Sequence, residues 1–159
     1  MISEIRVIKS LSEIDKDDWN TVAAVGNFDG VHLGHQKIIE QAKMLAKRLG
    51  TVPSILTFEP HPRVLFQTDG IPFRLSSSAS KALALSTLGI ELIFELQFDK
   101  SFAQLSAEDF VVRVLKENLR LQHVVCGYDF VFGHRRRGTA EILENLAMQV
   151  DIGVTIIPA

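Results

Sequence analysis

Short apolar runs and amphipathic stretches alternate along the 159-residue chain. Residues 22–26 are apolar throughout, which is typical of a buried strand. In 36–49 the apolar positions recur at helical spacing, and Gly50 stands where it would end that helix. The next run, 53–58, has the residues of a strand, and the prolines that follow it exclude further regular pairing. The first third of the chain therefore predicts a strand, a helix and a second strand.

The middle of the chain continues in the same way. A helix is predicted over 77–88, and a strand over 90–98, where every second residue is apolar. Ser106 and Asp109 resemble a capping box, with aspartate in place of the usual glutamate. The helix that they open carries an apolar face that includes Phe110.

The last part of the chain predicts two more strands. One covers 123–127 and leads into a polar loop over 128–138. Thr139 then caps a helix, and a final strand covers 154–157. Strands that alternate with helices form a parallel sheet with helices on both faces, and right-handed crossovers make it doubly wound and Rossmann-like. Ligands bind such a sheet beyond the carboxyl ends of its strands.

The composition fits one globular domain over residues 1–159. With 47% hydrophobic residues, 23% charged residues and a net charge of −2, nothing indicates nucleic acid or a membrane surface as a partner. No run approaches the 18 apolar residues of a membrane-spanning helix. The single cysteine, Cys126, excludes an internal disulfide and fits a cytoplasmic location. It lies in an apolar stretch, so it is interpreted as a small core residue.

The glycine-rich stretch 26–35, Gly-Asn-Phe-Asp-Gly-Val-His-Leu-Gly-His, carries the clearest chemical signal. Its three glycines let the backbone turn tightly beside a ligand, and the start of the next helix offers N–H groups to phosphate. His32 and His35 are three residues apart, so both imidazoles can face one phosphate. The alternatives are a solvated turn and a zinc pair, although no cysteine accompanies the pair. The stretch is neither a Walker A loop nor a dinucleotide fingerprint, and we favour phosphate binding.

Two further segments follow predicted strands. Residues 57–62 read Thr-Phe-Glu-Pro-His-Pro, which is either a rigid loop that presents one imidazole or a simple strand stop. Asp129 follows the strand 123–127, where it can bind a ribose hydroxyl or a cation, or form an Asx turn. The arginines at 135–137 can attract a polyanion, although the residues alone favour a solvated loop. All of this chemistry falls at the carboxyl ends of predicted strands, where a ligand is expected.

These segments together resemble one known family. Residues 32–35 match the His-x-Gly-His signature of the nucleotidylyltransferase superfamily, and the longer stretch 26–35 resembles the bacterial riboflavin kinase/FMN adenylyltransferase (FAD synthetase) family. Residues 57–62 are similar to that family's Thr-Phe-x-Pro-His-Pro. Residues 127–133, with Gly138 beyond, are similar to its Gly-x-Asp/Asn-Phe-x-Phe-Gly-x4-Gly. The resemblance covers nearly the whole chain and implies the Rossmann-like nucleotidylyltransferase fold.

The resemblance implies an adenylyltransferase that joins two small-molecule substrates, FMN and ATP, to give FAD and pyrophosphate, with Mg²⁺ accompanying the ATP. It makes His32 and His35 the catalytic residues and leaves the metal ligand unassigned. The residues that it assigns to ATP are Gly26, Asn27, Phe28, Asp29, Gly30, His32, Gly34, His35, Gly127 and Asp129. The residues that it assigns to FMN are Pro60, His61, Pro62, Arg63 and Phe130. Phe58 and Phe132 can also stack on a flavin, although phenylalanines that flank strands are more often core residues.

The sequence departs from the family pattern at its end. The family continues into a Ser-Ser-Thr-x-x-Arg-like segment that contacts ATP phosphates, and usually into a riboflavin kinase β-barrel, whereas this sequence stops at Ala159. We therefore expect a fragment of a longer protein, also because a parallel sheet that ends on a strand leaves its last layer uncovered. Two alternatives remain: a nucleotidylyltransferase with another phosphorylated acceptor, and a nucleotide- or flavin-binding fragment without turnover.

Overall fold

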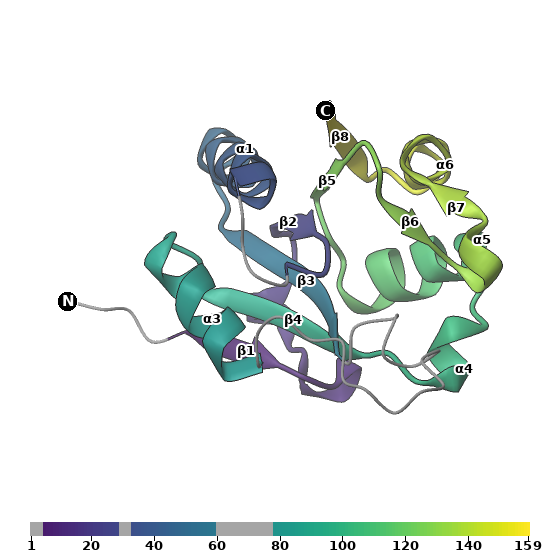
Figure 1. Ribbon diagram of the computed structural model, residues 1–159, viewed down its shortest axis with the longest axis horizontal. Coiled ribbons are helices and arrows are strands. Elements are labelled where there is room, and N and C mark those ends of the chain that lie inside the picture. The colour runs from purple at the N-terminus through teal and green to yellow at the C-terminus, as the bar shows by residue number, and fades with distance from the viewer. Residues whose placement is uncertain (1–4, 29–32, 60–77) are drawn as a thin grey trace.

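Six strands form one parallel sheet in the computed structural model, which describes residues 5–28, 33–59 and 78–159 (Figure 1). Their order across the sheet is β1-β4-β3-β2-β5-β8. The strands are β1 (Arg6–Ile8), β2 (Val22–Val25), β3 (Pro53–Glu59), β4 (Leu92–Gln97), β5 (His123–Gly127) and β8 (Gly153–Ile157). From β2 the chain runs outward through β3 to β4, and then returns to build β5 and β8 on the other side. This order confirms the predicted doubly wound, Rossmann-like sheet.

Helices cover both faces of the sheet, as predicted (Figure 1). The longer helical elements are α1 (Leu33–Leu49), α3 (Ser78–Thr87), η3 (Phe110–Asn118) and α6 (Ala140–Met148), and the short ones include α4 (Lys100–Ala103) and α5 (Ala107–Asp109). Helices α1 and α3 pack on one face, and η3 and α6 pack on the other. Helix α5 runs directly into η3, which is π-helical. The sheet therefore separates two apolar cores.

The central strand β2 shows how one short run serves both cores. Val22 and Ala24 belong to the core under α1, while Ala23 and Val25 belong to the core under η3 and α6. All four residues are buried, which is why the run is apolar throughout instead of alternating with polar residues. The two central alanines are small, so helices can approach the sheet closely from either side.

The ends of several helices follow the sequence signals. Gly50 and Gly89 lie at positive φ (71° and 89°), a conformation that favours glycine and stops the helices before them. The Ser106 side chain accepts a hydrogen bond from the backbone N–H of Asp109, and Thr139 caps α6 by accepting one from Ile142. Helix α1 begins at Leu33, three residues earlier than the apolar spacing predicted.

Three features differ from the sequence-based prediction. Strand β1 was not predicted, because it has three residues and its Arg6 side chain is half exposed. The segment 128–138 was expected to be a polar loop, but it contains one strand and the start of the next of an antiparallel pair, β6 (Val131–Phe132) and β7 (Gly138–Thr139). Two-residue strands are too short to show periodicity. Strand β4 was expected to alternate, yet it is buried on both faces, because it lies between β1 and β3.

Two further properties bear on the class of protein. Cys126 is fully buried on β5, as predicted for a core residue, and burial raises the pKa of its thiol to about 12. Within the three described ranges, no helix is long and apolar enough to cross a lipid bilayer.

Candidate active site

The centre of the sheet provides the expected ligand-binding edge. Strands β2 and β5 are neighbours, with Ala24 opposite Val125, and the chain leaves them toward opposite sides of the sheet. Two residues beyond that pair, Gly26 and Gly127 stand at the carboxyl ends of the two strands. In doubly wound sheets, ligands bind where the strand order reverses in this way. The first and third sequence segments therefore meet at the switch point of the fold.

Helix α1 starts directly above this point. A side chain at Gly127 would meet the Cδ1 atom of Ile38, on α1, at 3.5 Å and the Oδ1 atom of Asp129 at 3.0 Å, so the backbone here lies close to the helix. Gly34 and His35 belong to the first turn of α1, where the backbone N–H groups of a helix start and the positive end of the helix dipole favour phosphate. Asp29, Gly30 and His32 lie outside the described residues.

A buried phenylalanine, Phe28, packs against His35, which is the one of the two motif histidines that the structure describes. The Phe28 side chain is fully buried in the core under α1, and its backbone is left-handed with φ of 54°. Its ring meets the His35 imidazole edge-on, with the ring centroids 5.0 Å apart. Because the Phe28 ring is enclosed, only its backbone can contact a ligand, and its side chain acts by holding the imidazole.

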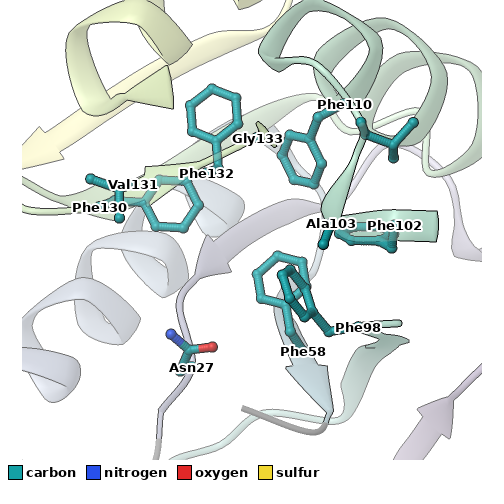
Figure 2. A pocket seen from close by; sticks show the side chains of 11 residues that line it. Asn27, Phe58, Phe98, Phe102, Ala103, Phe110, Phe130, Val131, Phe132 and Gly133 are labelled. Atoms are coloured by element: carbon teal, nitrogen blue, oxygen red, sulfur yellow. The ribbon is translucent and has the colours of Figure 1, made fainter. Parts of the chain in front are cut away.

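Strand β3 holds the beginning of the glycine-rich stretch. The Gly26 N–H donates to the carbonyl of Leu56 at 3.1 Å, and the buried Thr57 hydroxyl donates to the Asn27 carbonyl at 3.0 Å. The Asn27 side chain then turns toward a cluster of phenyl rings (Figure 2). Two consecutive residues thus follow β2: Gly26 lies at the switch point, and Asn27 lies in an aromatic pocket.

The pocket is walled mainly by phenylalanines that are distant in the sequence (Figure 2). Among the residues that the structure describes, six phenylalanines line it: Phe58, Phe98, Phe102, Phe110, Phe130 and Phe132. They come from the ends of β3 and β4, from α4 and η3, and from the segment after β5. The other lining residues are Asn27, Ala103, Leu105, Val131 and Gly133.

The rings form a continuous network with a buried floor and an accessible rim. Phe58, Phe110 and Phe132 are buried, whereas Phe98, Phe102 and Phe130 are partly buried. Neighbouring ring centroids lie 5.2–6.4 Å apart, and the Phe130 and Phe132 rings stack with an interplanar angle of 13°. The enclosed cavity measures about 50 Å³, and the empty space is about 430 Å³ when the open mouth is counted.

A buried ion pair fixes the end of β3. The Lys81 ammonium on α3 lies 2.9 Å from the Glu59 carboxylate, and the two side chains are only 3% and 15% exposed. The Phe98 N–H also donates to the Glu59 carbonyl at 2.8 Å. Glu59 is therefore held from two sides at the point where the second sequence segment continues. The rest of that segment, 60–63, lies outside the described residues.

The third segment forms a turn and a hairpin. The Phe130 N–H donates to the Gly127 carbonyl at 3.1 Å, which closes a turn after β5 and directs the Phe130 ring into the pocket. Asp129, within this turn, is exposed. The arginines at 135–137 are exposed on the connection between β6 and β7. Among the residues that the structure describes, no cluster of three or more histidine, cysteine, aspartate or glutamate side chains is arranged to hold a metal.

Comparison with known proteins identifies the family. Residues 14–159 match the family model described as FAD synthetase. The chain belongs to the FAD synthetase family. Curated bifunctional riboflavin kinase/FMN adenylyltransferases are similar to it: 31% identity over 150 residues for Buchnera aphidicola (subsp. Acyrthosiphon pisum), and 32% over 151 residues for Escherichia coli K12. These alignments cover 94% and 95% of this chain but 48% of each relative, so the chain spans about half of their length.

A solved structure shares the fold of this family member. A crystal structure named as a macrolide-efflux protein from Streptococcus pneumoniae superposes with a TM-score of 0.82 and is 27% identical in sequence. The superposition covers 99% of this chain and 50% of that one. The likeness extends over the whole sheet and both helical layers, and it agrees with the family assignment in fold.

Proposed function

We propose that this chain is an FMN adenylyltransferase domain, which transfers the AMP part of ATP to the phosphate of FMN. The observation that carries the proposal is that a pocket walled by six phenylalanines includes Asn27, a residue of the glycine-rich stretch that leads from β2 at the switch point toward α1. The first feature suits a flat apolar ring system and the second suits phosphate. Asn27 joins the two, because it lines the pocket and directly follows Gly26.

In this proposal the two substrates share the carboxyl edge of the sheet. The α1 start binds the ATP phosphates, with His35 and the backbone of its first turn as donors. The residues proposed for ATP are Gly26, Phe28 through its backbone, Gly34, His35, Gly127 and Asp129, together with Asp29, Gly30 and His32. Phe130 and the segment 60–63 are proposed for FMN, whose ring enters the pocket.

The reaction needs positioning more than proton transfer. The FMN phosphate is already anionic at neutral pH, and one of its oxygens forms a bond to the α-phosphorus of ATP. The bond from that phosphorus to the oxygen bridging the α- and β-phosphates breaks, and pyrophosphate leaves. Donors fixed at the α1 start stabilise the charge that develops during this exchange. Mg²⁺ would supply further neutralisation, and Asp129, an exposed carboxylate at the end of β5, suits an ion that keeps several water ligands.

The alternative hypotheses, another nucleotidylyltransferase or a binding domain without turnover, predict different outcomes in one experiment. The chain would be incubated with ATP, Mg²⁺ and one of three acceptors: FMN, riboflavin, or ribose 5-phosphate, which has the phosphate but no flavin ring. We expect FAD and pyrophosphate in equal amounts from FMN, and no product from riboflavin, which offers no attacking phosphate. Comparable transfer to ribose 5-phosphate would indicate another nucleotidylyltransferase. Binding of FMN and ATP without any FAD would indicate a binding domain instead of an enzyme.

The proposal also includes a cytoplasmic location, where both ATP and a reduced Cys126 are expected.

A further inference from the structure

The aromatic pocket contains one polar side chain whose hydrogen bonding is incomplete. The Asn27 Oδ1 atom is buried and has no hydrogen-bond partner among the described residues. In Figure 2 this oxygen is turned toward Phe58 and Phe98, which can offer it no N–H or O–H donor. A buried carbonyl oxygen without a donor is uncommon in folded proteins and costs stability, so its presence calls for a physical explanation.

The position of Asn27 is fixed by the fold. Its own carbonyl accepts from the Thr57 hydroxyl, and Thr57 is fully buried on β3. Gly26, the residue before it, is tied to β3 through the Leu56 carbonyl. With the backbone held at two points, the carboxamide is presented to the pocket before any ligand arrives. This is the arrangement expected of a side chain that is preorganised to recognise a ligand.

We propose that Asn27 determines flavin specificity by accepting a hydrogen bond from the N3–H group of the isoalloxazine ring; this inference rests on the proposed function. Oxidised isoalloxazine is a flat, largely apolar system of three fused rings that carries a single ring N–H, at N3. The phenylalanines cover its faces, and Asn27 Oδ1 supplies the acceptor for that one donor. Asn27, which the family resemblance groups with the ATP residues, thereby becomes a residue of the flavin site.

The adenine amine of ATP is the competing donor, and the layout of the site argues against it. The phosphate-binding start of α1 lies on one face of the sheet, and the core to which Phe58, Phe110 and Phe132 belong lies on the other. In the proposed function both substrates bind at the carboxyl edge of the sheet, with ATP on the α1 side of that edge, so the pocket on the other side takes the ring of the substrate whose phosphate attacks.

The test measures binding without turnover. FMN, 3-methyl-FMN and 5-deaza-FMN are titrated onto the chain, and the flavin signal is followed as it changes on entering the aromatic pocket. The methyl group removes the N3 donor, whereas the deaza analogue keeps it. Because one hydrogen bond to a buried acceptor is at stake, we expect 3-methyl-FMN to bind about tenfold more weakly than FMN, and 5-deaza-FMN to bind like FMN. This comparison uses the unaltered protein and does not depend on any variant folding.

Two variants then locate the effect. In Asn27→Leu, a substitution of similar size without an acceptor, FMN should lose about tenfold in affinity and the preference for FMN over 3-methyl-FMN should disappear. In Phe102→Leu, which alters the pocket rim without a polar group, both flavins should weaken together and the preference should remain. Thermal unfolding of both variants checks that they are folded.

The outcomes separate this inference from the function on which it rests. If the unaltered chain binds FMN but does not distinguish it from 3-methyl-FMN, the role of Asn27 is wrong and the proposed function stands. If Asn27→Leu lowers the affinity for ATP about tenfold and leaves the affinity for FMN unchanged, Asn27 recognises adenine and the inference is overturned. Failure of the unaltered chain to bind any flavin would overturn the proposed function itself.

Discussion

Adding one methyl group at Gly138, in the variant Gly138→Ala, should disrupt the aromatic pocket by displacing the Phe132 ring that lines it. A Cβ atom there would lie 2.6 Å from the Cε1 atom of Phe132 and 2.7 Å from two further atoms of the same ring. Carbon atoms normally stay about 3.5–4.0 Å apart, so the ring would have to retreat by about 1 Å. It has little room, because it is only 7% exposed, packs 5.2 Å from the Phe110 ring and stacks at 5.6 Å on Phe130.

The cost follows from this crowding. Overpacking a filled core by one methyl group typically destabilises a protein by about 1–3 kcal/mol. For a domain of this size, that range corresponds to a fall in Tm of about 3–10 °C. The Phe132 ring forms part of the pocket floor, so Gly138→Ala should also weaken FMN binding. Urea unfolding gives the free-energy change, and a flavin titration gives the loss of affinity.

A double-mutant cycle isolates the clash from other effects of the substitution. Phe132→Ala removes the ring atoms that the new methyl group would meet, so Gly138→Ala should cost little further stability in that background. An equal cost in both backgrounds would show that the loss arises in the backbone of β7 and not at the ring. Full stability together with unchanged FMN affinity in the single variant would refute the reasoning altogether.

Three further predictions concern other parts of the chain. His35→Ala should lower adenylyl transfer by about 10²–10³-fold while the fold stays intact, because it removes one fixed donor from the exposed first turn of α1. Lys81→Met should destabilise the fold by about 1.5–3 kcal/mol, because it removes the charge-assisted contact at 2.9 Å between two largely buried side chains, Lys81 and Glu59. Burial lowers the pKa of His123 from its ordinary value of 6.5, so the unfolded chain takes up this proton more readily; stability present above about pH 6.5 should therefore fall as the pH drops below it. These effects are measured by steady-state FAD formation, by urea unfolding, and by urea midpoints across pH.

Each of these predictions has a result that would contradict it. Wild-type turnover by His35→Ala would remove that imidazole from the phosphate site. A Glu59→Gln/Lys81→Met double variant should recover part of the lost stability; if it is as unstable as Lys81→Met, the lost attraction between the two charges is not the cause. His123→Gln should flatten the acid side of the stability curve, because it removes the buried imidazole whose pKa is lowered and keeps a polar side chain opposite Thr155. An unchanged curve would place the acid sensitivity elsewhere.

The sequence predicted the fold well where local signals were strong. Apolar runs at 22–26 and 53–58 gave β2 and β3, and the glycines at 50 and 89 marked real helix ends. Strand β1 was not predicted, because its pairing partner, β4, lies more than 80 residues further along the chain. Three residues are also too few to show the alternation of apolar and polar positions that marks a strand. The burial of both faces of β4 likewise depends on neighbours that its own alternation cannot reveal.

The candidate site was predictable in part. Motif spacing pointed to the start of α1 and to the turn after β5, and the fold brings both to the switch point. The aromatic pocket was not predicted as a unit. Phe98, Phe102 and Phe110 come from three separate elements, and each one taken singly reads as an ordinary apolar residue. Only the crossing of β4 into α4 and η3 brings them opposite Phe58. The one available hint was the position of several phenylalanines just after predicted strands.

The separation of two apolar cores by the sheet has a consequence for how such a domain can change over time. In the proposed function, the ATP phosphates bind at the start of α1, on one face of the sheet. The pocket that binds the flavin ring lies on the other face, which η3 and α6 cover. Only the small residues of β2, such as Ala23 and Ala24, stand between them at the centre. Exchanges among the pocket phenylalanines therefore leave the packing of α1 intact. Acceptor choice can diverge, by natural drift or by engineering, while the nucleotide half of the reaction is inherited unaltered.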